Sequence, residues 1–121
     1  MTVHALIVDD SQSMRSVVRM TLTGEGFEVT EACDGNEALS LAKNHKYDVV
    51  ITDVNMPGKD GLTLIKELRE TSSYRHTPIL TLTTQIGDDK KKQGRLAGAT
   101  GWITKPFSPV KLVEVLKKLL G

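Results

Sequence analysis

Four charged residues directly follow apolar segments of the chain, and their types and spacing suit the chemistry of phosphate groups. The pair Asp9–Asp10, the single Asp53 and the single Lys105 each come after a short, mostly apolar run. If these runs are parallel strands of one sheet, their carboxyl ends meet at one edge, where open α/β sheets bind ligands. Three carboxylates and one ammonium are then expected to converge, as at a metal-dependent phosphorylation site.

Three carboxylates at close range repel one another, and a hard divalent cation with oxygen ligands relieves that repulsion. Mg²⁺ fits best, and it takes only one or two carboxylates while keeping several waters. We therefore expect Asp10 and Asp53 to bind it directly, Asp9 to act through water, and the backbone carbonyl of Asn55 to complete the shell. The alternative is that Asp9 and Asp10 only favour the dipole of a following helix.

Asp53 is the expected nucleophile, because a carboxylate can attack a phosphoryl group and form an acyl phosphate. Lys105 supplies the fixed positive charge that such a transfer needs. Thr83 ends another apolar run, where its hydroxyl can donate to a phosphoryl oxygen; the alternative is packing, since threonine is common in strands. Pro106 follows Lys105, and an X-Pro bond at this turn would fix how the lysine projects.

Short runs rich in β-branched residues alternate with stretches of helical period, which indicates βαβ units and a doubly wound parallel sheet of the α/β class. We expect five strands, near 4–8, 27–31, 48–52, 78–83 and 100–104. We expect five helices, the first after Ser11 to Gly24 or Gly26 and the others near 36–44, 61–71, 88–97 and 109–120.

Two of the expected helices differ in how well they can be anchored. The first carries an apolar face of Met14, Val17, Val18, Thr21 and Leu22. The fourth offers almost nothing apolar before Leu96, so it is our candidate for a mobile surface. Its run Lys90–Lys92 is either attractive to an acidic partner or simply solvated.

The length and composition of the chain limit the classes of function that it can have. A chain of 121 residues suits one domain, 1–121, and we expect it to be monomeric. The net charge is +1, so no bulk field favours nucleic acid or a membrane surface. The single cysteine, Cys33, excludes an internal disulfide and fits a reducing compartment. No apolar run approaches the roughly 20 residues that span a bilayer, so we expect a soluble, cytoplasmic protein.

The motifs together resemble those of response regulator receiver domains, and in particular the stand-alone, CheY-like chemotaxis regulators. The resemblance covers the whole chain and is carried by Asp9-Asp10-Ser11, Asp53-Val54-Asn55-Met56-Pro57-Gly58-Lys59-Asp60-Gly61, Thr83-Thr84 and Lys105-Pro106-Phe107. It implies a flavodoxin-like fold with strand order 2-1-3-4-5. It also implies that Asp53 takes a phosphoryl group from a sensor histidine kinase, with Mg²⁺, and that the domain promotes hydrolysis of its own acyl phosphate without being a conventional enzyme.

By the same resemblance, Asp9, Asp10, Asp53 and Asn55 are metal-site residues, and Thr83 and Lys105 contact the phosphoryl group. Gln85 and Asn55 lie two residues beyond Thr83 and Asp53, so we expect their amides to flank the path of the attacking water and to tune the phosphate lifetime.

Phosphorylation is expected to draw Thr83 toward the new oxygens and to change the surface of the fourth helix, fifth strand and fifth helix. In the family, an aromatic residue three positions before the lysine then moves inward. Here that residue is Trp102, where Tyr or Phe is usual, and an indole is larger and carries an N–H that needs a partner. We therefore expect either a partial inward movement or a fixed anchor for a partner.

Several alternatives stay open. A flavin carrier would need a phosphate-binding loop where Asp9 and Asp10 stand, and a colourless protein would exclude it. An aspartyl-nucleophile phosphatase would want a second acid at position 55; turnover of a phosphate ester without self-labelling would favour it. Within the receiver family, the chain is a chemotaxis output protein that binds the flagellar motor switch, a phosphate sink, or a phosphorelay intermediate, and a separate phosphatase is a further expected partner.

Overall fold

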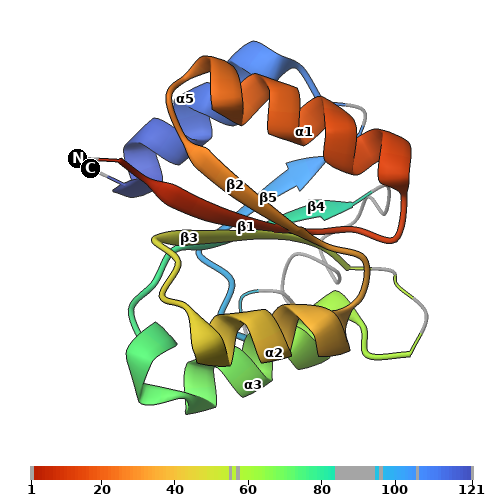
Figure 1. Cartoon of the computed structure of the whole chain (residues 1–121), viewed down its shortest axis with the longest axis vertical. Coiled ribbons are helices and arrows are strands. Elements are labelled where there is room, and N and C mark those ends of the chain that lie inside the picture. Colours follow the sequence, from red (N-terminus) through yellow and green to blue (C-terminus); the bar gives the residue numbers. More distant parts are fainter. Residues whose placement is uncertain are drawn as a thin grey trace.

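The computed structural model describes residues 2–54, 56, 58–83, 95, 97–105 and 107–120. Five parallel strands form one sheet in the order β2-β1-β3-β4-β5, so the doubly wound, flavodoxin-like fold is confirmed (Figure 1). The elements are β1 (His4–Val8), α1 (Gln12–Gly24), β2 (Glu28–Ala32), α2 (Gly35–Asn44), β3 (Val49–Asp53), α3 (Gly61–Glu70), a 3-10 turn η1 (Ser72–Tyr74), β4 (Ile79–Thr83), β5 (Gly101–Thr104) and α5 (Pro109–Leu120).

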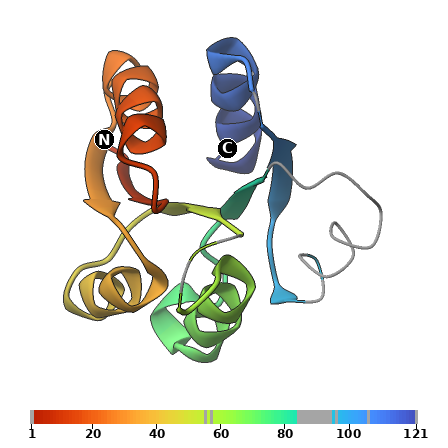
Figure 2. The same ribbon diagram turned by 90° about the vertical axis from the view of Figure 1, so that its right-hand side faces the viewer.

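Among the described residues, two helices cover each face of the sheet. Figure 2 shows α1 and α5 on one side and α2 and α3 on the other. Successive residues of a strand point to opposite faces. In β1, Ala5 and Ile7 accordingly join the apolar cluster under α1 and α5, while Leu6 and Val8 join the cluster over α2 and α3. A strand that is buried on both faces has a continuous run of apolar residues, so the central strands could be predicted from the sequence.

Short polar side chains fix where three helices begin. The Ser11 hydroxyl accepts a hydrogen bond from the backbone N–H of Met14 and so caps α1. Asp34 and Asp60 cap α2 and α3 in the same way. Each cap satisfies an N–H that the helix itself leaves unpaired. Helices therefore start a few residues after the strands end, and the connecting turns are held close to the carboxyl edge of the sheet.

The expected strands and the first, second, third and last helices are confirmed, with ends that differ by one or two residues. The expectation for Val17 was wrong: its exposed fraction is 46%, whereas Val18 and Leu22 are fully buried. Each helical residue turns the side chain by about 100°, so Val17 lies beside the buried stripe and not within it. The fourth helix, expected near 88–97, lies largely outside the described residues, as does the lysine run 90–92.

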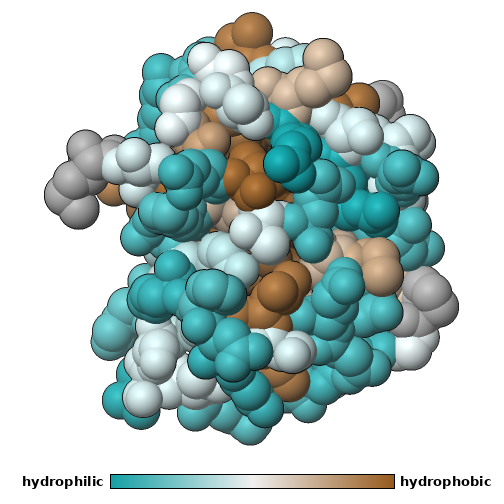
Figure 3. Space-filling view, viewed as in Figure 1, coloured by the Kyte–Doolittle hydropathy of each residue, from teal (hydrophilic) through white to brown (hydrophobic). Residues whose placement is uncertain are grey.

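The surface over β2 is largely hydrophilic, with apolar residues showing mainly where the helices meet the sheet (Figure 3). Partly buried apolar side chains, including Val29, Phe27 and Leu41, pack against the margins of the two clusters. In the part of the chain that the structure describes, no helix has both the length and the apolar character to cross a membrane.

At the amino end of the sheet, the buried Tyr74 hydroxyl joins three backbone groups. It points to the carbonyl oxygens of Ala42 and His45, at 2.9 and 2.5 Å, and accepts from the N–H of Tyr47 at 3.2 Å. Burial raises the pKa of the Tyr74 phenol, because the phenolate would lose its solvation. The hydroxyl thus ties η1 to the segment between α2 and β3.

Arg69 makes a second network at the same end. Its Nη1 donates to the carbonyl oxygens of Tyr74 and Thr77, both at 2.7 Å, and its Nε donates to that of Gly98 at 2.9 Å. Burial lowers the pKa of this guanidinium. Gly98 has a φ of +112°, and a Cβ there would approach Arg69 Cγ to 2.8 Å. Arg69 therefore fixes the approach to both β4 and β5.

Candidate functional site

Three carboxylates meet at the carboxyl edge of the sheet. Asp9 and Asp10 follow β1 and Asp53 ends β3, and these strands are direct neighbours. One oxygen from each carboxylate lies within 4.8 Å of the others. Asp9 and Asp53 are buried and Asp10 is exposed, so the cluster opens to solvent on the Asp10 side. The sequence-based expectation that these three residues come together is thus met in the structure.

Asp9 is held at every polar atom. Its N–H donates to the Ala32 carbonyl, and its own carbonyl accepts from Arg15 Nη1 at 2.6 Å. Its Oδ1 accepts from the backbone N–H of Ser11 at 2.9 Å, and its Oδ2 accepts from Lys105 Nζ at 2.8 Å. The side chain is 3% exposed. Asp9 is therefore a fixed part of the framework around the cluster.

The backbone of Asp53 is pinned from two directions. The Thr52 hydroxyl donates to the Asp53 carbonyl at 2.9 Å. Gly61, the first residue of α3, lies so close to the end of β3 that a Cβ on it would stand 2.1 Å from the Asp53 carbonyl oxygen. The N–H of Gly61 also donates to the Val54 carbonyl. Only glycine allows this approach. The β3–α3 connection is consequently folded back onto the strand end that carries the Asp53 carboxylate.

Lys105 brings the positive charge to the cluster. Its Nζ lies 2.8 Å from Asp9 Oδ2 and 3.3 Å from Asp53 Oδ2, and its side chain is 10% exposed. Its backbone N–H donates to the Thr83 carbonyl at 2.7 Å, which ties the residue to the end of β4. Thr83 itself is fully buried at that strand end. Both residues thus lie where the sequence predicted them, at neighbouring strand ends beside Asp53.

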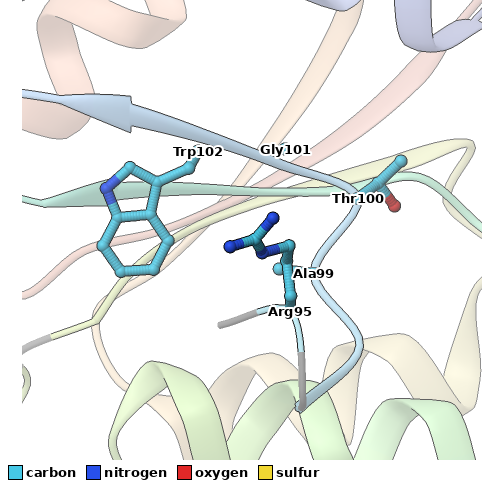
Figure 4. A pocket seen from close by; sticks show the side chains of 5 residues that line it. All are labelled: Arg95, Ala99, Thr100, Gly101 and Trp102. Atoms are coloured by element: carbon cyan, nitrogen blue, oxygen red, sulfur yellow. The ribbon is translucent and has the colours of Figure 1, made fainter. Parts of the chain in front are cut away.

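Trp102 lies in the middle of β5 and lines a cavity of about 220 Å³ (Figure 4). Its indole and the guanidinium of Arg95 lie on the same side of the strand in that view, and Ala99, Thr100 and Gly101 complete the lining. The indole Nε1 is buried, and within the described part of the chain it has no hydrogen-bond partner.

Three expected site residues, Asn55, Gln85 and Pro106, lie outside the described residues, so their expected roles stay predictions. Sequence reasoning missed Arg15, which contacts the Asp9 carbonyl, and Glu31, which holds Arg15. One signal was available. Arg15 and Arg19 lie four residues apart on one face of α1, and Glu31 is an acid on the neighbouring strand.

The donor set fits Mg²⁺. Three carboxylates supply hard oxygen ligands close together, and Lys105 is the cation that contacts two of them in the described part of the chain. Like charges held at this distance favour an ion between them. One oxygen of each carboxylate lies within 4.8 Å of the others, so the three residues are close enough to share one ion.

Residues 5–117 match the response regulator receiver domain family, and the chain belongs to that family. It is 40% identical to chemotaxis protein CheY-3 of Vibrio cholerae over 94% of this chain and 88% of that protein. It is 42% identical to the chemotaxis protein CheY homolog of Campylobacter jejuni over 96% and 91%. The structure of V. cholerae CheY4 superposes with a TM-score of 0.96 at 46% identity, covering 99% of this chain and 100% of that one.

Proposed function

We propose that this receiver domain accepts a phosphoryl group on Asp53 from the phosphohistidine of a sensor histidine kinase and acts as a CheY-like chemotaxis regulator. The observation that carries the proposal is the Asp53 carboxylate at 3.3 Å from Lys105 Nζ, beside two further carboxylates at the carboxyl edge of the sheet. Membership of the receiver family and the two chemotaxis relatives support it. Proteins of this kind signal and are not conventional enzymes.

In the transfer step, an Asp53 carboxylate oxygen attacks the phosphorus of the phosphohistidine. An O–P bond forms and the N–P bond breaks, and the electron pair of that bond leaves with the imidazole nitrogen, which takes a proton. Lys105 Nζ, already within reach of Asp53 Oδ2, donates to an oxygen of the transferred group and balances part of its charge. Asp9 keeps the ammonium in place from the other side.

Asp9, Asp10 and Asp53 would hold Mg²⁺, together with the carbonyl of Asn55, which is outside the described residues. When bound, the ion supplies positive charge that neutralises the phosphoryl oxygens and the carboxylates around them. Asp10 is the exposed member of the cluster, so its side chain gives access from solvent. The role of the protein is to keep these oxygens close together before the ion arrives.

The domain also promotes loss of its own phosphoryl group in this proposal. Water attacks the phosphorus, the acyl phosphate O–P bond breaks, and the Asp53 carboxylate leaves with the electron pair. The amides of Asn55 and Gln85 orient that water, since an amide is too weak a base to take its proton. If Gln85→Ala and Asn55→Ala both left the dephosphorylation rate unchanged, this part of the proposal would be wrong.

The signal passes from Asp53 to β5 through Thr83. Thr83 is buried at the end of β4, and its carbonyl is bonded to the N–H of Lys105. A hydroxyl drawn toward the phosphoryl oxygens changes the packing behind it, next to the strand that carries Trp102. The indole is large and half-buried, so we expect a partial movement and a less than thousandfold change in partner affinity.

The proposal implies a cytoplasmic location. The chain covers 88% and 91% of the two chemotaxis relatives, which supports a role like theirs. The expected output partner is a flagellar motor switch protein. Affinity capture with phosphorylated and unphosphorylated protein tests this: phosphate-dependent capture of the motor protein supports it. Capture of kinases alone would instead indicate a phosphate sink or relay intermediate.

The site is tested with acetyl phosphate as phosphodonor, with and without Mg²⁺, followed by intact mass measurement. We expect one added phosphoryl group, greatly reduced by a chelator and absent in Asp53→Asn. Asp48→Asn is the matched control, because Asp48 lies at the amino end of the sheet, where it accepts from the His4 N–H. Labelling of Asp53→Asn to the level of the natural protein would overturn the assignment.

A further inference from the structure

The peptide group between Asp9 and Asp10 has a dedicated side-chain contact that the proposed transfer does not use. Arg15, in the first turns of α1, donates from Nη1 to the Asp9 carbonyl at 2.6 Å. A peptide group is planar, so fixing that oxygen also fixes the N–H of Asp10 and the direction of the chain between the two carboxylates. The Arg15 contact therefore bears on the orientation of both residues.

The Arg15 side chain is itself held in place. Its Nε donates to Glu31 Oε1 at 3.1 Å, from α1 across to β2, and the side chain is 15% exposed. The second Glu31 oxygen accepts from Arg19 Nη1 at 2.6 Å. A planar guanidinium can bind a carboxylate with one edge and a carbonyl with another, which a lysine ammonium cannot reproduce at fixed geometry. Strongly hydrophilic residues gather at this junction of α1 and β2 in Figure 3.

Glu31 also determines which acidic group the Arg15 guanidinium pairs with. The guanidinium contacts the Asp9 carbonyl, so without a partner its charge would be attracted to the neighbouring carboxylates and would compete with a divalent cation. Glu31 balances that charge through the ion pair of its Oε1 with Arg15 Nε. The pair thus holds the Asp9–Asp10 turn without adding a competing cation to the cluster.

We propose that Arg15 is a positioning residue of the cation site: anchored by Glu31, it fixes the Asp9–Asp10 peptide and thereby sets the affinity for Mg²⁺. This inference rests on the proposed function. Arg15 acts through the backbone and touches neither the phosphoryl group nor the ion. Substituting Arg15 should therefore change the affinity for Mg²⁺ and should not act on the Asp53 nucleophile directly.

The test is calorimetric titration of the full chain with Mg²⁺ alone, without phosphodonor. Arg15→Met is expected to weaken binding about tenfold, as for other residues that orient metal ligands from outside the first shell. Arg15→Lys keeps the charge but cannot make both contacts, so it should recover only part of the loss. Arg19→Met is the matched control: it removes the other arginine of the same Glu31, leaves the Asp9 carbonyl untouched, and should change affinity less than twofold.

Thermal unfolding without Mg²⁺ is measured in parallel, because a purely structural role would lower stability and leave Mg²⁺ affinity unchanged. That result, or equal loss of affinity in Arg15→Met and Arg19→Met, would overturn the inference. If Arg15→Met does not fold, Glu31→Gln, which frees the guanidinium, must weaken Mg²⁺ binding for the inference to stand. A natural protein that binds no Mg²⁺ would instead refute the proposed function, so the two failures are distinguishable.

Discussion

At the amino end of the sheet, the partly buried guanidinium of Arg69 donates to carbonyl oxygens of Tyr74, Thr77 and Gly98, so its positive charge meets complementary dipoles. At the carboxyl end, the buried carboxylates of Asp9 and Asp53 lie beside each other and beside one ammonium, that of Lys105. Both ends hold charge below the surface, but within the described part of the protein the carboxyl end sets three carboxylates against a single contacting ammonium.

The difference indicates what each end is for. A buried polar network whose members are all hydrogen-bonded rigidifies the fold. A cluster of like charges lowers stability and is retained where a ligand or a reaction needs it. We therefore expect substitutions at the amino end to change stability without changing phosphoryl chemistry. At the carboxyl end, removing a carboxylate should abolish chemistry and leave the fold at least as stable.

The largest effect is expected from Gly61→Ala. A Cβ there would stand 2.1 Å from the Asp53 carbonyl oxygen, so the backbone at the carboxyl end must move. We expect a loss of about 3 kcal/mol in the free energy of unfolding, together with loss of phosphorylation. Denaturant unfolding and intact mass measure the two. Gly24→Ala is the control, since nothing lies within 4 Å of its Cβ position, and it should be neutral or slightly stabilising. A tolerated Gly61→Ala would show that this end is not closely packed.

Arg69→Met is expected to be the next most damaging change. It leaves the carbonyl oxygens of Tyr74, Thr77 and Gly98 without their donor, at a cost of about 2.5 kcal/mol. Phosphorylation by acetyl phosphate should persist under conditions where the variant is folded. Arg75→Met, at an exposed position nearby, should change stability by less than about 0.5 kcal/mol. Loss of phosphorylation in folded Arg69→Met would contradict the separation of the two ends.

Tyr74→Phe should lower stability by about 1.5 kcal/mol at neutral pH, because the Tyr47 N–H loses its acceptor. The difference in stability between the natural protein and Tyr74→Phe should depend on pH. Burial raises the pKa of Tyr74 above its ordinary value of 10.0, so the folded protein prefers the protonated phenol. The stability from this group is fully present below pH 10 and is lost as the pH rises through the folded pKa.

Phenylalanine cannot ionise, so the difference between the natural protein and Tyr74→Phe should narrow above pH 10. Urea unfolding from pH 8 to pH 11 measures it. Tyr47→Phe is compared in parallel: the charge of that phenol only adds to the pKa shift of Tyr74, so its loss should change the pH dependence less than Tyr74→Phe does. A difference that stays constant through this range would show that the phenol is not the titrating group.

The smallest expected effect has the opposite sign. Asp53→Asn removes one of three crowded carboxylates, while Lys105 keeps its contact with Asp9, so stability without Mg²⁺ should rise by about 1 kcal/mol. Asp10→Asn should raise it less, because Asp10 is exposed and its charge is better solvated. Thermal unfolding in the presence of a chelator compares the three proteins. A less stable Asp53→Asn would mean that the Lys105 pair outweighs the repulsion.

The positions of Asp9, Asp53 and Lys105 could be predicted from the sequence because one rule suffices: parallel strands end at a common edge. Helix starts were predictable for a local reason, since Ser11 and Asp60 bond to N–H groups three residues ahead. Strand ends were less accurate, because pairing with a neighbour decides them, and a neighbour is not visible in local sequence.

Contacts between distant residues were not predictable. Arg15 and Glu31 are 16 residues apart and meet only because β2 lies beside β1 in the register that pairs Ile7 with Glu31. The need for glycine at position 61 likewise depends on how closely α3 returns to the end of β3. Val17 shows the limit of periodicity: an apolar residue beside a buried stripe is not itself buried. Packing decides these details after the elements have formed.

The only tryptophan of this chain is Trp102, and it stands in β5, with β4 between it and the site at the end of β3. All indole emission of the protein therefore originates from a single position, with no background from elsewhere. An indole whose Nε1 is buried should emit further to the blue than one that exchanges hydrogen bonds with water. The molecule consequently carries its own optical probe, and a change in this emission after addition of phosphodonor would report the arrival of the signal at β5 without any attached dye.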